Sequence, residues 1–181
     1  SRLKEQHRVQ YSRTRRLVYL GLATGMAMAL HIFEGLIPMP TDLIVPGFKL
    51  GLANIITLYV VTSFGTRDAI IVSILRTTLG SLLAGNFLTP TFFFSFAGGV
   101  ASAIVMGLVY RYGGRHFSLL GISLLGAVTH NVAQLTVASL IIETVGIFAY
   151  LPYMLFFALP TGAFVGLVTA QVRKHYASGG F

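Results

Sequence analysis

The sequence predicts an all-α integral membrane protein, a bundle of six transmembrane helices with both termini in the cytoplasm. Of the 181 residues, 55% are apolar and 10% are charged, and the mean hydropathy is +0.78. Soluble domains are about one quarter charged. Apolar runs recur along the chain, and the basic residues gather on one side of them. These observations exclude an ordinary soluble enzyme, because six spans of about 20 residues leave no room for a catalytic domain.

A basic tail, residues 1–16, opens the chain. Six Lys or Arg residues and one Glu give it +5 of the formal net charge of +8. The tail leads directly into an apolar segment, where basic residues commonly set topology and contact anionic lipid. We therefore expect a cytoplasmic tail at the bilayer and no nucleic-acid partner.

One membrane domain, residues 17–176, follows the tail. Apolar runs bounded by charges or by Gly and Pro predict six spans, at about 17–37, 50–64, 69–84, 92–110, 119–142 and 150–172. The second and third are short for a hydrocarbon core of about 30 Å, so four spans with a re-entrant pair are the alternative. Residues 177–181 are expected to be a cloning remnant.

The distribution of basic residues predicts the orientation. With the N-terminus inside, the inner segments carry eleven Lys or Arg residues, whereas the outer loops carry Lys49. Arg76 lies within the third span. This positive-inside asymmetry places both termini in the cytoplasm. It does not separate six spans from four, since both numbers are even.

Small residues line two rows of the first span. Ala23 and Ala27 lie one turn apart, and Gly21, Gly25 and Ala29 form the second row. In lipid, small residues four apart let another helix approach closely. The first row therefore indicates either internal packing or a docking face for another protein.

Two stretches carry a resemblance to a known family: Ile-Pro-Met-Pro at residues 37–40 and Lys-Leu-Gly-Leu-Ala-Asn-Ile-Ile-Thr-Leu at residues 49–58. With the alanine pair of the first span, they resemble the family labelled Gx transporter or heptaprenyl diphosphate synthase component I. The resemblance covers nearly the whole chain after the tail. That family is similar to the substrate-binding S components of energy-coupling factor (ECF) vitamin transporters.

The resemblance implies a bacterial plasma-membrane protein with the six-helix S-component fold. Such a protein captures a small vitamin-like, isoprenoid-related or flavin-related nutrient from outside. Its partners would be a transmembrane T subunit, which meets the paired alanines Ala23 and Ala27, and two cytoplasmic ABC ATPases. The alternative is a membrane subunit of quinone or flavin metabolism, acting in electron transfer or as an accessory to heptaprenyl diphosphate synthesis.

No enzymatic motif or cofactor site supports catalysis by this chain. The five acidic residues are scattered, so the Asp-rich motif of prenyl synthases is absent, and no Walker A string or Cys is present. No second His or carboxylate stands at ligand spacing near His130, so a metal site is not expected. ATP hydrolysis is therefore expected in partner subunits.

Ionisable residues at membrane depth are costly, which makes each a candidate for function. Arg76 could clamp an anion through its guanidinium; the alternatives are an ion pair with Glu34 or snorkelling to an interface. His31 and Glu34 share a face and either pair with each other beside the headgroups or line a pocket. Glu34 is the best carboxylate candidate for the ligand.

A polar stripe marks the fifth span, where His130, Asn131 and Gln134 share one face. Such a stripe should point into the bundle, either towards a ligand or to bond across helices. Asn54, early in the second span, together with Lys49, is either a further ligand contact or a helix start with an interfacial lysine.

An uncharged, Phe-rich segment, residues 85–96, joins the third and fourth spans. Asn86 and Phe87 begin it. It is either an aromatic lid over a planar or apolar ligand or an interfacial aromatic belt. The predicted ligand contacts are Glu34, Asn54, Arg76, Asn86, Phe87, His130, Asn131 and Gln134.

Overall fold

The computed structural model describes residues 13–38, 49–113 and 116–178, and the regular elements in these ranges are all helical. The elements in chain order are α2 (Arg13–Gly35), α3 (Asn54–Ser63), α4 (Thr66–Leu83), α5 (Pro90–Leu108), the π-helical turn η2 (Val109–Gly113), α6 (Leu119–Ile142), the 3-10 turn η3 (Val145–Tyr150) and α7 (Leu151–Ser178). The expected helices are thus present in the expected order.

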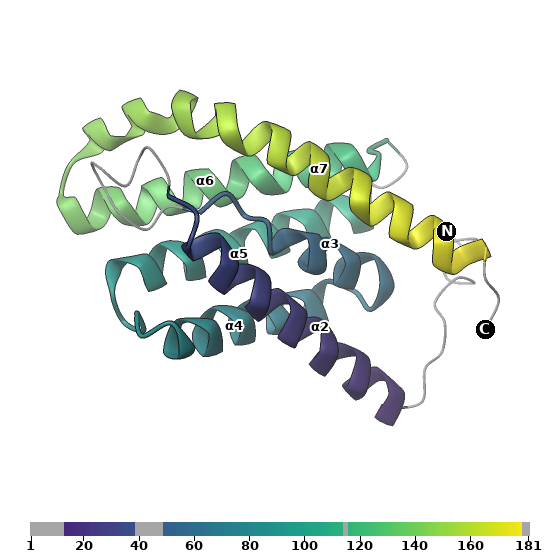
Figure 1. Ribbon diagram of the computed structural model, residues 1–181. Helices are drawn as coiled ribbons and strands as arrows, with labels where there is room; N and C mark the ends of the chain where they lie inside the picture. Colours follow the sequence, from purple (N-terminus) through teal and green to yellow (C-terminus); the bar gives the residue numbers. More distant parts are fainter. Residues whose placement is uncertain (1–12, 39–48, 114–115, 179–181) are drawn as a thin grey trace.

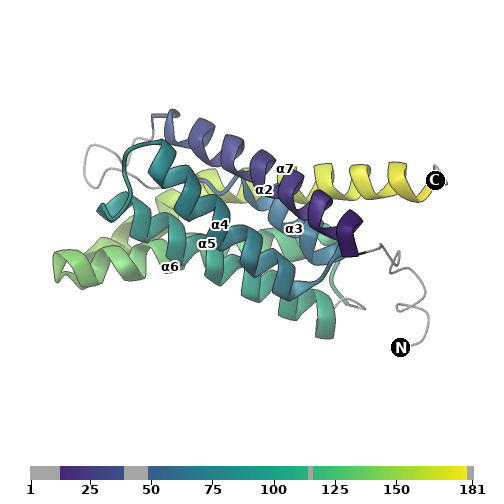
Figure 2. The ribbon, with the colours of Figure 1, turned by 90° about the horizontal axis from the view of Figure 1, so that it is seen from below.

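The helices form one bundle with two distinct ends. The start of α2 and the end of α7 lie at the same end, and the turn between α4 and α5 lies with η3 at the other, which we call the distal end (Figure 1). Figure 2 shows α6 on the opposite side of the bundle from α2. The most extensive contacts join α5 with α6 and α6 with α7.

Four helical stretches in the described part of the chain are long and apolar enough to cross a membrane. They comprise α2, α5 with η2, α6, and residues 145–175 of η3 and α7. With 10 residues, α3 rises only about 15 Å. In α4, Arg67, Asp68 and Arg76 lower the hydropathy. Six complete crossings are therefore not confirmed, and the side of the membrane that the termini face stays a prediction.

A short non-helical segment, residues 49–53, precedes α3 inside the bundle. Gly51 has φ of +85°, a left-handed conformation that favours glycine, and its carbonyl accepts a hydrogen bond from Asn54 N at 2.9 Å. At the other end of α3, Gly65 has φ of +109° and donates to Val60 O at 3.0 Å. These two glycines make α3 a half-helix that begins in the interior and turns directly into α4.

The apolar core includes the first row of small residues in α2. Ala23 is 8% exposed and Ala27 is fully buried, and both belong to the core cluster, to which α2 is joined mainly through α4 and α3. By contrast, Cβ atoms added to Gly21 and Gly25 would meet nothing within 4 Å. In this structure Ala23 and Ala27 pack internally, and their contact with a partner stays a prediction.

Candidate functional site

Polar side chains from several separate elements meet in the interior of the bundle. The main members of this polar cluster, each at most 5% exposed, are His31, Glu34, Lys49, Asn54, Arg76, His130 and Gln134. They come from α2, the 49–53 segment, α3, α4 and α6. Five of the predicted ligand contacts thus lie together, although they are far apart in sequence.

The main chain of the 49–53 segment links α2 to α6. Gln134 Oε1 accepts a hydrogen bond from Lys49 N at 3.0 Å, and Gln134 Nε2 donates to Lys49 O at 2.9 Å. On the other side, Glu34 Oε1 accepts from the backbone amides of Gly51 and Leu52, the latter at 3.1 Å. The side chains of α2 and α6 therefore satisfy main-chain groups that lie outside any helix.

The carboxylate of Glu34 lies at the amino-terminal end of α3. Free amides and the helix dipole make this position favourable for an anion. The expected pair between His31 and Glu34 is not formed, because each residue has another partner. Glu34 thus accepts main-chain hydrogen bonds that stabilise the start of the half-helix.

Lys49 Nζ lies 2.9 Å from His31 Nε2 and donates to His31 O at 3.3 Å. An ammonium group can only donate, so Nε2 of His31 accepts and carries no proton. Burial lowers the pKa of Lys49 to about 8, with Arg76 acting in the same direction and Glu34 opposing it. Lys49 is therefore still mainly cationic at neutral pH.

Arg76 is 2% exposed in the middle of α4, so it does not snorkel to an interface. Its Nη2 donates to Asn54 Oδ1 at 3.1 Å, and Ser102 Oγ donates to the same oxygen at 3.2 Å. Arg76 Nε has no hydrogen-bond partner among the described residues. Within 4.0 Å, the described part of the chain gives Arg76 no carboxylate, so the alternative of an ion pair with Glu34 is not found.

His130 lies beside this arginine, and its ring interacts with the backbone of Gly98 and Lys49. Neither ring nitrogen makes a hydrogen bond of good geometry to the residues that the structure describes. Ser73 Oγ and Ser95 Oγ are also buried without a partner there. Buried polar groups are nearly always hydrogen-bonded, so this concentration of free groups indicates a place for a polar ligand.

Asn131 is 1% exposed but bonds within its own helix, since Nδ2 donates to Ala127 O at 2.9 Å. Asn86 and Phe87 lie at the distal turn. Asn86 N donates to Ser81 O at 3.0 Å, and the Phe87 ring packs edge-on against another aromatic ring of α5 at 4.9 Å. The described contacts do not bring these three residues into the polar cluster, and their role in binding stays a prediction.

The sequence analysis did not single out Ser73. It also did not identify Gly80 and Gly99 as positions where the lack of a side chain leaves room for neighbouring polar side chains. A Cβ on Gly99 would lie 2.8 Å from Ser73 Oγ and 3.0 Å from Arg76 Nη2. One on Gly80 would lie 2.9 Å from His31 Cδ2. Ser73, Arg76 and Gly80 are three and four residues apart, so helical spacing placed them on one face of α4.

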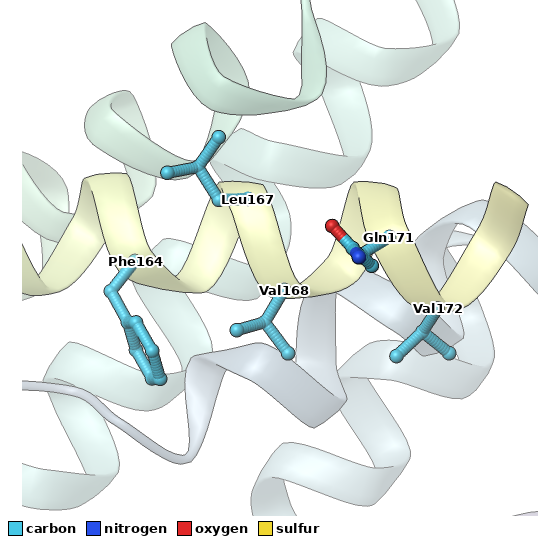
Figure 3. Close-up of a pocket in the computed structure, with 5 residues that line it drawn as sticks. All are labelled: Phe164, Leu167, Val168, Gln171 and Val172. Atoms are coloured by element: carbon cyan, nitrogen blue, oxygen red, sulfur yellow. The ribbon is translucent and has the colours of Figure 1, made fainter.

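A separate groove of about 250 Å³ runs along the outside of α7. Figure 3 shows its lining residues, which are Phe164, Leu167, Val168, Gln171 and Val172. The lining is mostly apolar and includes none of the predicted ligand contacts. The groove therefore does not mark the candidate site.

No curated protein matches the chain, and no solved structure matches it. One family does, over residues 23–172, a range that begins in α2 and ends in α7 and therefore contains the whole polar cluster. The match agrees with the resemblance carried by residues 37–40 and 49–58. The chain belongs to the family described as heptaprenyl diphosphate synthase component I, the Gx transporter family.

Proposed function

We propose that this protein is the substrate-binding S component of an ECF-type uptake transporter in the bacterial plasma membrane. Its substrate would be a small vitamin-like, isoprenoid-related or flavin-related nutrient. ATP would be hydrolysed by two ABC ATPases, coupled through a T subunit. The chain itself would bind the nutrient from outside and release it after the helix bundle reorients.

The observation that carries this proposal is the polar cluster around the interrupted helix α3. In lipid, irregular backbone is tolerated only where protein or a cavity surrounds it, and many transporters place such breaks at their substrate sites. Here the 49–53 segment is held by Glu34 and Gln134, next to Arg76, whose Nε has no partner among the described residues. Buried polar groups are nearly always hydrogen-bonded, so this N–H supports a polar ligand at the cluster.

We place the partner contact on α2. The resemblance assigns this contact to Ala23 and Ala27, which lie in the core here, so a large side chain at either position would also disturb the fold. Gly21 and Gly25 lie on the exposed face of the same helix. The glycine pair and the alanine pair are therefore substituted separately. An effect of the glycine pair indicates a partner on the exposed face, whereas an effect of the alanine pair alone indicates that α2 must separate from the bundle to bind the partner.

The test is purification of the tagged protein from its native membranes in mild detergent, followed by mass spectrometry. Recovery of a T subunit and two ABC ATPases is the expected result. The double variant Gly21→Trp/Gly25→Trp should lose them and still elute as a folded protein. Ala23→Trp/Ala27→Trp tests the inner pair, and Ala170→Trp on the exposed face of α7 is the matched control.

Two outcomes would contradict the proposal. Recovery of a prenyl synthase, a quinone enzyme or a flavoprotein without any ATPase would favour a subunit of quinone or flavin metabolism. Unchanged recovery of the ATPases and unchanged uptake in both double variants would remove α2 as the docking helix.

A further inference from the structure

We propose that the ligand carries an oxyanion, a carboxylate or phosphate group, that binds Arg76 in the place now taken by the amide of Asn54. The inference rests on the proposed function for its biological meaning, since it specifies the ligand class of the same site. Its physical content, that the described residues give Arg76 no counter-anion, is independent of transport.

Arg76 is a buried cation with an uncharged partner. A buried charge is strongly disfavoured unless it is paired, and a charged partner is the usual solution. The hydrogen-bond partner that the structure gives Arg76 is the neutral carbonyl oxygen of Asn54, while Nε is free among the described residues. A buried guanidinium of this kind is suited to bind an anionic acceptor.

One edge of the guanidinium has the right geometry for an oxyanion. Nε and Nη2 form this edge, which matches the two oxygens of a carboxylate or phosphate. Asn54 Oδ1 takes the Nη2 position and also accepts from Ser102 Oγ at 3.2 Å. A ligand oxyanion that displaced this amide would gain both N–H groups of the edge.

Further polar groups lie close to the guanidinium. Ser73 Oγ and Arg76 Nη2 both lie next to Gly99, and His130 lies next to the adjoining Gly98. A hydroxyl and an imidazole can each donate to an oxygen. An oxyanion on Arg76 would therefore find the hydroxyl of Ser73, which has no partner among the described residues, with the His130 ring close by.

The charges of the polar cluster favour the same ligand. Its buried ionisable residues include two cations, Lys49 and Arg76, against the carboxylate of Glu34. Glu34 is already engaged by the backbone amides at the start of α3. The cations Lys49 and Arg76 thus outnumber the carboxyl group among these residues, and in a low-dielectric interior this favours an anionic ligand.

The decisive variant is Asn54→Asp, which places a carboxylate on Arg76 without changing the size of the side chain. It should raise the melting temperature of the purified protein by a few degrees, because it supplies the missing charge. It should also abolish the response to added anions. The readout is the fraction of protein that remains monodisperse on size exclusion after heating, since the chain has neither Trp nor Cys.

Asn131→Asp is the matched control. Asn131 is equally buried, on α6, but its amide bonds the main chain of its own helix instead of an arginine. The same change there buries an unpaired carboxylate and should lower the melting temperature. Opposite signs for the two variants support the proposal, and a similar loss of stability in both overturns it.

Anion binding is tested with chloride, acetate, orthophosphate and diphosphate at equal ionic strength. Acetate or a phosphate should raise the melting temperature above the value in chloride, and the more effective anion identifies the oxyanion as carboxylate or phosphate. The response should disappear in Arg76→Gln and weaken in Arg76→Lys, which keeps the charge but loses the fork. Equal responses in wild type and Arg76→Gln would overturn the proposal, even if Asn54→Asp does not fold.

These measurements separate the two proposals. If the anion site is present but no ATPase copurifies, the S-component function fails and the ligand class stands. If the ATPases copurify and anions bind without Arg76, the ligand class fails and the function stands.

Discussion

Gly98 of α5 and His130 of α6 are in direct contact: a Cβ on Gly98 would lie 2.8 Å from both Cε1 and Nδ1 of the histidine ring. His130 is 3% exposed, so its ring has little room to move. The contact brings the histidine next to the backbone of α5, one residue before the glycine that faces Arg76. The lack of a side chain on Gly98 therefore determines where His130, a candidate ligand contact, can lie.

Gly98→Ala should destabilise the protein and weaken ligand or anion binding. The added methyl group cannot fit against the ring, so α5 and α6 must separate or the ring must rotate away. Overpacking of this kind typically costs about 1–3 kcal/mol. The measurement is the midpoint of unfolding in an SDS titration.

Gly25→Ala is the control for the Gly98 prediction, because nothing lies within 4 Å of its added Cβ. It should be neutral or stabilise α2, since alanine favours the helix over glycine by about 1 kcal/mol. The double variant Gly98→Ala/His130→Ala should recover stability. If Gly98→Ala is as harmless as Gly25→Ala, the close packing described here is wrong.

The helices were predictable because each has a local cause that the sequence displays. The expected fifth span, 119–142, coincides with α6 (Leu119–Ile142). Ser118 caps its first turn by accepting from Gly121 N at 3.1 Å, and Glu143 ends it with φ of +56°. The last helix runs beyond the expected end at 172, because Arg173 and Lys174 are polar but continue the helical conformation.

The side chains of the site were predictable, but their partners were not. Helical spacing placed His130 and Gln134 on one inward face, and hydropathy marked Arg76 as unusual. However, Glu34 and Gln134 bond main-chain atoms of the 49–53 segment, and main-chain groups have no residue-specific signal in the sequence. Complementary charge suggested Glu34 as a partner of Arg76, whereas in the structure the hydrogen-bond partner of Arg76 is Asn54.

Gln134→Leu should be strongly destabilising. It removes both hydrogen bonds to Lys49 and leaves a buried N–H and a buried C=O without a partner, each at a cost of about 1–3 kcal/mol. Gln134→Glu keeps the acceptor and should lose less. Thr136→Val, on the exposed face of the same helix, is the control and should change stability by less than about 0.5 kcal/mol. Equal SDS midpoints for Gln134→Leu and Thr136→Val would contradict this prediction.

The ion pair between Arg16 and Asp68 should contribute little. Arg16 donates from Nε at 3.0 Å and from Nη2 at 2.5 Å to one oxygen of Asp68, but half of the arginine side chain is exposed. Solvent screening limits such a pair to about 1 kcal/mol or less. Arg16→Gln should thus produce a small loss of stability that vanishes near 1 M salt, while Arg67→Gln, exposed and adjacent to Asp68, should show no such salt dependence. A large, salt-independent loss would show that Arg16 acts through packing instead.

Stability should rise with pH through the titration of Lys49. Burial lowers the pKa of its amine to about 8, whereas the same amine in the unfolded chain titrates near 10.4. Between these values the unfolded chain holds a proton that the folded protein has released, so unfolding becomes less favourable as pH increases. The penalty for the buried cation is complete below about pH 8 and is relieved towards pH 10.

Lys49→Met isolates this effect, because it removes the titrating group and keeps a long side chain. The melting temperature of the wild type minus that of Lys49→Met should increase from pH 7.5 to pH 10. Other titrating groups contribute to both proteins and cancel in the difference. A difference that falls with pH would mean that folding raises the pKa of Lys49, and one that is flat would mean that Lys49 titrates at its ordinary pKa. In that case its ammonium would be solvated, and the contact with His31 would not form the closed polar interior on which the site depends.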